Sequence, residues 1–307
     1  MAFGMSPFPL QFGRRGGGLP RRPWLPTDIA GNCMWHRHDL PELLTLRAVE
    51  ATNYIAARSD AGTAGKGAAQ STEDYQPLLI ADAYNGLPVA RYDGSNDYLV
   101  SPAGNIGDAK LTTEVDQTWT YMALVAIAGT EEDKCDFASN PNISYGSQGL
   151  SFNWNVPTAA SRSPRLFFGG TLTNTSGGAQ NGELNCIIIT WTGTVGTLYV
   201  NGGTGIALTP GAVTTGPTLH FGCQNPGLRH CAFDEAERYI IDEALGTADR
   251  QRLEGYALHK YGRQAALPGG HPYKSSPPTI VDSNAEALSD NTGTLLIDND
   301  GEFLRAA

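Results

Sequence analysis

Two short stretches carry side chains that could hold a metal ion. Residues 36–39 (HRHD) offer three potential ligands, a spacing that zinc sites use together with a further ligand from elsewhere. On a strand, His36 and His38 would share one face. Asp93 and Asp97, in the run DGSND, could supply oxygen ligands to calcium. A polar loop is the favoured explanation of residues 36–39, and an Asx turn explains DGSND equally well. We therefore expect no resident metal or cofactor, with calcium at Asp93 and Asp97 as the open alternative.

Aromatic residues beside asparagines could bind a sugar. Trp154 lies between Asn153 and Asn155, and Tyr145 follows two further asparagines. Sugar rings pack on aromatic faces, and amides hydrogen-bond to hydroxyl groups. Turn-forming asparagines and a core tryptophan would explain the same residues without a ligand. Glycan binding by Tyr145, Asn153, Trp154 and Asn155 is therefore a hypothesis.

Carboxylate runs occur at 131–133 (EED) and 234–237 (DEAE). We expect these side chains to be solvated or paired in salt bridges. The chain contains no G-x-S-x-G nucleophile elbow, no phosphate-binding loop and no dinucleotide fingerprint. We therefore predict no catalytic residue and no enzyme activity.

Composition narrows the class of protein further. The chain has 307 residues with 37 Gly, 19 Pro and 17% charged residues, a balance that disfavours a mainly helical fold. Its net charge of −10 argues against a nucleic-acid partner. No apolar stretch reaches the ~18 residues that a membrane helix needs, so we expect no membrane insertion.

Five cysteines stand at wide spacings, and none forms a C-x-x-C pair. The odd number and the spacing favour free thiols over a disulfide framework. Residues 1–27 also lack the apolar block of a secretory signal peptide. Both observations lead us to expect assembly in a bacterial cytoplasm.

The first 32 residues have the composition of an extended arm. They are rich in Pro and Gly, and residues 1–27 contain four arginines and no carboxylate. Such a segment has too little apolar surface to form its own core, but its aromatic and Arg side chains could bind a neighbouring protein. The predicted partner-binding residues are Phe3, Phe8, Phe12, Arg14, Arg15, Arg21, Arg22 and Trp24.

From residue 33 the pattern is one of short strands between turns. Residues 118–128 are apolar on both faces, as in a strand buried within a sandwich. Residues 186–191 and 198–201 flank a Gly-containing loop and predict a hairpin. Residues 247–262 predict a single helix that begins with Thr247 as its cap, ends at Gly262, and covers a sheet edge.

Three motifs resemble the concanavalin A-like (laminin-G-like) jelly-roll domains of bacteriophage and bacterial surface proteins. The motifs are NGLPVARYDGSNDYL at 85–99, LYVNGG at 198–203, and ALGTADRQRLEGYALHKYG with LPGGHPYKSSPP within 242–278. The resemblance implies an all-β, two-sheet antiparallel sandwich, and it implies that His271 and its neighbours dock the chain back on that sandwich. The E-x-D-x-x-E strand of the related glucanases is absent, which argues against glycoside hydrolysis.

These observations predict an arm at 1–32, a laminin-G-like jelly roll with one short helix at 33–278, and an extension at 279–307. The resemblance and the arm together suggest a bacteriophage virion protein, a capsid decoration or tail component. We expect it to bind capsid or tail subunits, to form a homo-oligomer, and to display its sandwich outward. The alternative function is that of a glycan-binding module that adheres to the host surface. A glycoside hydrolase is the third and least favoured hypothesis.

Overall fold

The structure is a computed structural model of the chain. It describes residues 21–31, 33–101, 105–106, 109–110, 117–127, 134–138, 150–158, 161–168, 171–174, 179–180, 182–208, 218–224 and 229–281. For Arg21, Val281 and the strands within 105–110, 134–138 and 150–174, the description is confined to the backbone.

The chain divides into two units, which we describe separately. In the smaller unit, β1 (Arg21–Pro23) pairs antiparallel with β21 (Thr279–Val281). The arm was expected to contain no strand. The partner for β1 comes from the far end of the sequence, so no local pattern announces this pair.

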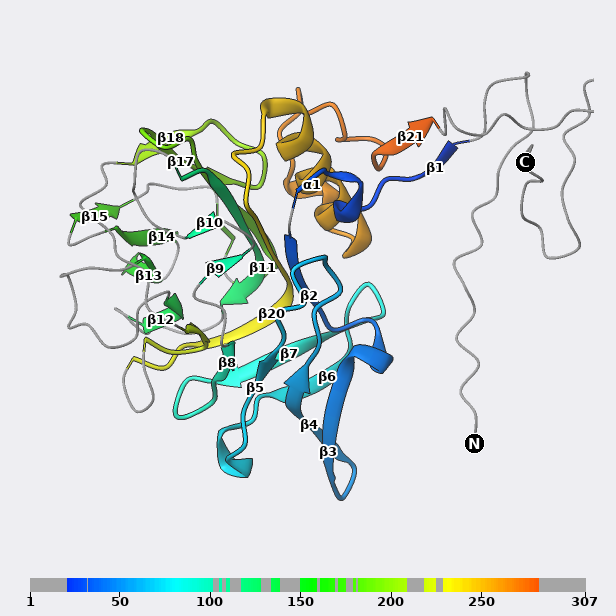
Figure 1. The fold of residues 1–307 in the computed structure, drawn as a ribbon, viewed down its shortest axis with the longest axis vertical. Coiled ribbons are helices and arrows are strands. Elements are labelled where there is room, and N and C mark those ends of the chain that lie inside the picture. Colours follow the sequence, from blue (N-terminus) through cyan, green and yellow to red (C-terminus); the bar gives the residue numbers. More distant parts are fainter. Residues whose placement is uncertain are drawn as a thin grey trace, which may run out of the picture. The chain divides into compact units, whose positions relative to one another are not determined.

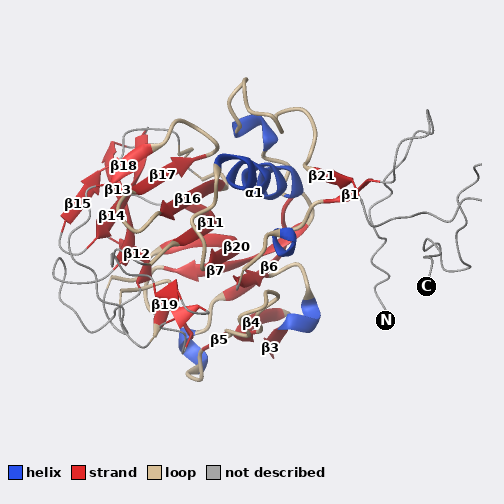
Figure 2. Ribbon diagram, turned by 45° about the horizontal axis from the view of Figure 1, so that its top comes forward, coloured by secondary structure: helices blue, strands red, loops and turns tan. Residues whose placement is uncertain are grey.

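The larger unit, Leu25–Pro278, contains the sandwich. Its strands pair antiparallel throughout, and the sheet folds over on itself to give two layers (Figures 1 and 2). The first layer consists of β18 (Ile206–Leu208), β17 (Gly196–Val200), β16 (Asn185–Trp191), β11 (Trp119–Ile127), β20 (Ala232–Ile241), β2 (Cys33–Arg37) and β7 (Leu87–Asp93). The two halves of β20 pair with different neighbours on one side, β7 with the first half and β2 with the second.

A run of strands links this layer to the second one. The link is formed by β6 (Leu78–Tyr84), β4 (Thr52–Arg58) and β3 (Leu44–Val49). The second layer consists of β5 (Ala68–Ala69), β8 (Leu99–Ser101), β19 (Leu219–Phe221), β12 (Lys134–Ala138), β13 (Leu150–Thr158), β14 (Ser161–Phe168) and β15 (Thr171–Asn174). A separate short pair is formed by β9 (Asn105–Ile106) and β10 (Ala109–Lys110), and the 3₁₀ turns are η1 (Pro26–Asp28), η2 (Pro41–Leu43), η3 (Glu73–Tyr75) and η4 (Gln264–Ala266).

The core lies between the two layers. Alternate residues of β11, among them Tyr121 and Val125, point inward, where they join Ile189 of β16 and Phe221 of β19 in one buried cluster. Every residue of β11 is buried, as the sequence predicted for a strand covered on both faces. The predicted fold class, a two-layer antiparallel β-sandwich with one C-terminal helix, is confirmed.

The helix α1 (Thr247–Lys260) begins after Gly246, which occupies the N-cap position, so the prediction of Thr247 as cap was wrong. Its expected place on a sheet edge was also wrong. The helix covers the outer face of the first layer (Figure 1), where Arg250 lies 3.8 Å from the ring centre of Tyr199 on β17. The outward side chains of Ile188 on β16 and of Tyr239 on β20 are fully buried.

The closing motif holds the tail against the helix. The buried side chain of His271 lies 3.0 Å from a carboxylate oxygen of Glu254, and the ring of His259 donates to the carbonyl of Tyr273 at 2.7 Å. Gly255 has no side chain where Tyr273 packs, since a Cβ atom there would lie 2.6 Å from the Cβ of Tyr273. The tail therefore docks on α1. It also packs directly on the loop after β17, since a Cβ atom on Gly202 would lie 2.9 Å from the ring of His271.

We expect Gly255→Ala to destabilise the protein, even though alanine is more favourable than glycine within a helix by ~1 kcal/mol. The added methyl group overlaps Tyr273, and overpacking of this kind costs roughly 1–3 kcal/mol. Chemical denaturation of the two proteins measures the difference. Gly269→Ala, where a Cβ atom would meet nothing within 4 Å, is the control, and an unchanged midpoint for Gly255→Ala would contradict the docking.

Four of the cysteines, Cys33, Cys186, Cys223 and Cys231, are buried free thiols. This agrees with the prediction as far as the described residues go, since the side chain of Cys135 lies outside them. In the part of the chain that the structure describes, no helix has the length and apolarity to span a membrane.

Candidate functional site

His36 lies on the inner face of β2 and His38 directly follows that strand, so the polar loop favoured for residues 36–39 was wrong for His36 and Arg37. Three of the four ring nitrogens bind protein groups. His36 donates from Nε2 to the carbonyl of Lys66 at 2.7 Å. His38 donates from Nδ1 to the carbonyl of Ala236 at 3.0 Å and accepts from Arg58 at Nε2. Burial and the neighbouring Arg58 lower the pKa of His36 and lower that of His38 to about 4. Both imidazole rings are therefore neutral side chains with a structural role.

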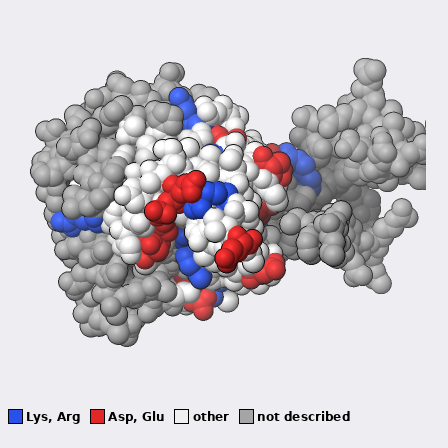
Figure 3. All heavy atoms as spheres, turned by 90° about the horizontal axis from the view of Figure 1, so that it is seen from below, with Lys and Arg blue, Asp and Glu red and all other residues white. Residues whose placement is uncertain are grey.

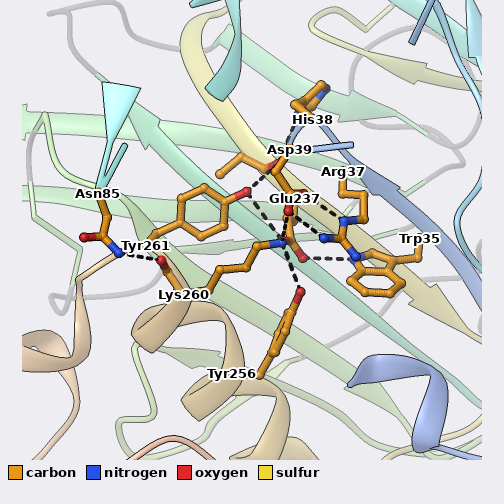
Figure 4. A network of polar contacts seen from close by, with 10 residues as sticks. Trp35, Arg37, His38, Asp39, Asn85, Glu237, Tyr256, Lys260 and Tyr261 are labelled. Atoms are coloured by element: carbon orange, nitrogen blue, oxygen red, sulfur yellow. Dashed lines mark hydrogen bonds and ion pairs between the residues drawn. The ribbon is translucent and has the colours of Figure 1, made fainter. Parts of the chain in front are cut away.

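Arg37 and Asp39, which alternate with these histidines, belong to a network of polar contacts beneath α1 (Figure 4). Asp39 accepts from Arg37 and from Lys260, and together they outweigh burial and lower the pKa of Asp39 to about 2. Lys260 also pairs with Glu237, which accepts from the indole of Trp35 at 2.9 Å. This network fastens the helix to β2 and β20.

A second charged cluster lies inside the sandwich. The side chains of Arg58, Glu235 and Arg238 are fully buried, and Glu235 bonds to both guanidinium groups. The register between β11 and β20 shifts so that Ala236 has no partner on β11. This β-bulge places Glu235 on the inner face and Glu237 on the outer face, although strict alternation would place both on one side.

All three carboxylates of residues 234–237 are thus paired, as the sequence predicted. Asp234 forms a bidentate pair with Arg91, with distances of 2.7 and 2.8 Å. The other run, 131–133, lies outside the described residues.

The candidate site is a groove of about 650 Å³ formed by β3, β4, η3, β7 and the loop after β7. Its lining combines two tyrosines, an amide, two guanidinium groups, four carboxylates and three aliphatic residues. The polar and aromatic side chains of this lining include Arg47, Tyr54, Glu73, Asp74, Gln76, Arg91, Asp93 and Asp97. A volume of this size is typical of small-ligand sites.

One wall of the groove is built around Arg47. Its guanidinium group lies 4.6 Å from the ring centre of Tyr54, the residue on β4 that pairs with it. It donates to the side chain of Gln76 at 2.7 Å and to the carbonyl of Glu73 at 2.8 Å. These bonds join η3 to the β3–β4 hairpin. They hold the guanidinium group of Arg47 over the ring of Tyr54 before any ligand binds.

The opposite wall comes from β7. The β6–β7 hairpin turns at Asn85 and Gly86, both with positive φ angles (52° and 73°), as a two-residue Asn-Gly turn requires. The hairpin places Arg91 on the solvent side, with its side chain half exposed. A smaller hollow of about 290 Å³ adjoins the groove and shares Arg91, Tyr92 and Ala232 with it. The two hollows together could hold an elongated ligand.

The end of the groove carries Asp93 and Asp97. Asp93 accepts from the backbone amides of Ser95, Asn96 and Asp97, and Asp97 accepts from the amide of Asp93 at 2.9 Å. Burial and the nearby charge of Asp93 raise the pKa of Asp97 to about 7. The loop is thus held by its own Asx hydrogen bonds, and among the described residues no three His, Cys, Asp or Glu side chains gather as a metal site.

The other sugar-binding candidates stay predictions. Tyr145 lies outside the described residues, and Asn153, Trp154 and Asn155 lie on β13, where only the backbone is described. Of the arm residues, Phe3, Phe8, Phe12, Arg14 and Arg15 lie outside the described residues, whereas Arg21 and Arg22 lie on β1 and Trp24 is buried.

The sequence did not single out Arg47, Tyr54 or the residues of η3. The available signal was modest: TNYIAAR at 52–58 contains β-branched and aromatic residues typical of a strand. No local pattern connects that strand to Asp74 or Arg91, because only the pairing of β4 with β6 and β6 with β7 brings them together.

Comparison with known proteins gives distant likenesses only. No family model matches the chain, and neither does any curated protein. Among solved structures, the binding domain of botulinum neurotoxin serotype D is 12% identical with a TM-score of 0.45, over 69% of this chain and 50% of that one. The binding domain of Paraclostridial Mosquitocidal Protein 1 is 10% identical with a TM-score of 0.47, over 69% and 51%.

A third similar structure is the Trypanosoma rangeli sialidase in complex with sialic acid. It is 13% identical with a TM-score of 0.45, over 74% of this chain and 33% of that one. This chain therefore spans about half or less of each of the three structures.

Proposed function

We propose that the protein is a glycan-binding β-sandwich module and that its ligand lies in the groove between the β3–β4 hairpin and β7. The observation that carries this proposal is the preorganised wall of Arg47, Tyr54 and Gln76, held by hydrogen bonds of 2.7–2.8 Å beside a hollow of about 650 Å³. This was the alternative to a virion structural role in the sequence-based reading.

The chemistry of the wall suits a saccharide. The C–H face of a sugar ring packs on an aromatic side chain, and its hydroxyl groups bond to carboxylates and guanidinium groups. Tyr54 supplies the ring, Glu73 and Asp93 supply acceptors, and Arg91 supplies donors. The adjoining hollow beyond Arg91 adds room for a second sugar unit.

We expect Tyr54→Ala to weaken saccharide binding by roughly 5- to 30-fold, because the loss of an aromatic contact costs about 1–2 kcal/mol. A glycan array, run with and without calcium, identifies a ligand, and isothermal titration measures its affinity for both proteins. Leu46→Ala is the matched control, since Leu46 is exposed on the same hairpin and does not line the groove. Equal affinity of Tyr54→Ala and the unaltered chain would place the ligand elsewhere.

We also propose, from the arm, that the module is carried on a virion and assembled in a bacterial cytoplasm. The composition of residues 1–27 supports this: four arginines and the three phenylalanines Phe3, Phe8 and Phe12 can bind a partner surface, whereas Trp24 is buried within the chain itself. A bound arm would add an attachment function to the glycan-binding sandwich.

Deletion of residues 1–20 tests the arm. The cut spares the unit Leu25–Pro278, in which Tyr239 donates to the carbonyl of Pro26, so the midpoint of denaturation should change little. We expect the full chain to sediment as an oligomer and the truncated chain as a monomer. An oligomer that survives the deletion would contradict an assembly role for the arm.

A further inference from the structure

We infer that the groove selects saccharides that carry no negative charge. This inference rests on the proposed function and names the ligand class of the same site. It follows from the charges that line the groove, from the partners that those charges already have, and from the geometry that a carboxylate ligand would need.

Carboxylates outnumber guanidinium groups around the groove. Four carboxylate side chains line it against two arginines: Glu73, Asp74, Asp93 and Asp97 against Arg47 and Arg91. One of these arginines is also paired with Asp234, outside the groove proper. Figure 3 views the molecule from the end where β3 and β4 lie in Figure 1. On that face, Asp and Glu side chains surround a few Lys and Arg side chains.

Both arginines have two of their three nitrogens committed to hydrogen bonds. Arg47 uses Nε for Gln76 and Nη2 for the carbonyl of Glu73. Arg91 uses Nε and Nη2 for the two oxygens of Asp234. A side-on bidentate pair with a ligand carboxylate needs Nε and one Nη group together, so an acidic sugar would have to displace one of these bonds to form it. The remaining Nη hydrogens can still donate to a sugar hydroxyl group.

Glu73, Asp74 and Asp93, in contrast, keep their negative charge beside the groove, whereas Asp97, with its pKa raised to about 7, carries only part of a negative charge near neutral pH. The hydrogen-bond donors to Asp93 and Asp97 in the described part of the chain are backbone amides and not cations. Their mutual repulsion contributes to the raised pKa of Asp97. The side chain of Glu73 is 72% exposed and lies 3.7 Å from Arg47, a loose pair. A ligand carboxylate would meet this repulsion, whereas sugar hydroxyl groups would donate to the same oxygens.

The expected discrimination is moderate because the groove is open to solvent. Two unit charges several ångströms apart at a protein surface interact by about 1 kcal/mol, and salt screens part of that. With an excess of between one and two negative charges, we expect an uncharged saccharide to bind roughly 5- to 30-fold more tightly than its carboxylated counterpart. The preference should shrink as salt is added.

Matched pairs of saccharides test the inference on the full chain. The probes are N-acetyllactosamine with and without a terminal sialic acid, and cellotriose and maltotriose with and without a terminal uronic acid. Titration calorimetry at low and at high salt gives both affinities. We expect any pair that binds to favour its uncharged member, with a smaller ratio at high salt.

Two variants test the cause. In Asp74→Asn and in Asp93→Asn, removal of one negative charge should reduce the preference for the uncharged member by roughly 2- to 5-fold. Glu42→Gln is the control, because Glu42 is exposed on η2 and does not line the groove. A change in Glu42→Gln as large as in the other two would mean that overall charge, not the groove, sets the preference.

The outcomes separate the two proposals. Equal or tighter binding of the carboxylated member would overturn the inference and leave glycan binding standing. If none of the six probes binds while other uncharged glycans on the array do, the same comparison is made with those glycans and their acidic forms. If no glycan binds at all, the proposed function itself is wrong.

Discussion

Replacement of Glu235 by Gln is expected to lower the free energy of unfolding by about 3–5 kcal/mol. The carboxylate is fully buried and pairs with Arg58 and Arg238, whose side chains are also fully buried. Glutamine would leave two guanidinium groups in the core without a counter-charge. The ring of Phe221, 4.6 Å from Arg58 and 5.1 Å from Arg238, could offset only a small part of that loss.

The same cluster gives a pH dependence. Burial alone would raise the pKa of Glu235, but Arg238 and Arg58 outweigh it and hold the pKa well below its usual value. A lowered pKa in the folded state means that the stabilisation is complete above the pKa of the unfolded chain, about 4.3. It is lost as the pH falls below that value. The unaltered protein should therefore lose stability steeply below pH 4, and Glu235→Gln should show a shallower loss.

Urea denaturation at pH 7 and at pH 3.5 measures both effects. Asp234→Asn is the control for the adjacent carboxylate, whose partner Arg91 is half exposed; a pair of that kind contributes at most about 1 kcal/mol. If Glu235→Gln cost no more than Asp234→Asn, the buried cluster would not have the role assigned to it. A triple replacement of Arg58, Glu235 and Arg238 by Met or Leu should recover much of the loss, because it leaves no buried charge.

Leu253→Ala is the second large expected effect. Leu253 is fully buried on the face of α1 that covers the sandwich, and truncation of such a leucine costs roughly 2–5 kcal/mol. The ion pairs of Lys260 with Asp39 and Glu237 keep the C-terminal end of the helix in place. The gap left by the leucine therefore cannot close easily, and we expect the upper half of that range.

Chemical denaturation again provides the measurement. Arg252→Ala on the exposed side of the same helix is the matched control, since its pair with Asp249 is largely solvated. We expect it to change the free energy of unfolding by less than about 1 kcal/mol. Similar midpoints for Leu253→Ala and Arg252→Ala would mean that the helix does not seal the outer face of the first layer.

Local chemistry explains which elements were predictable from the sequence. Asn85 and Gly86 tolerate the positive φ angles of a tight hairpin, and Gly262 ends α1 at a φ of +69°. The apolar run on β11 needs two covered faces wherever it lies. In each case a few neighbouring residues determine the structure, so the sequence pattern is sufficient.

The groove and the bulge depend on distant pairing and were not predictable. Strict alternation puts Glu235 and Glu237 on one face, and only the registers with β11, β7 and β2 show that Ala236 is an extra residue. The β3–β4 hairpin has half-exposed faces and a register shift after Thr45, so it lacks a clear period of two. Residues far apart in the sequence, such as Tyr54 and Arg91, meet only through β6.

The most direct test of the central claim is to locate a bound saccharide. The uncharged glycan with the highest affinity on the array would be titrated into isotope-labelled protein, with the backbone amide shifts followed by NMR. We predict that the largest shift changes fall at 47–54, 73–76 and 91–97, the segments that form the groove. Shift changes confined to the α1 face, or to β13 around Trp154, would contradict the account.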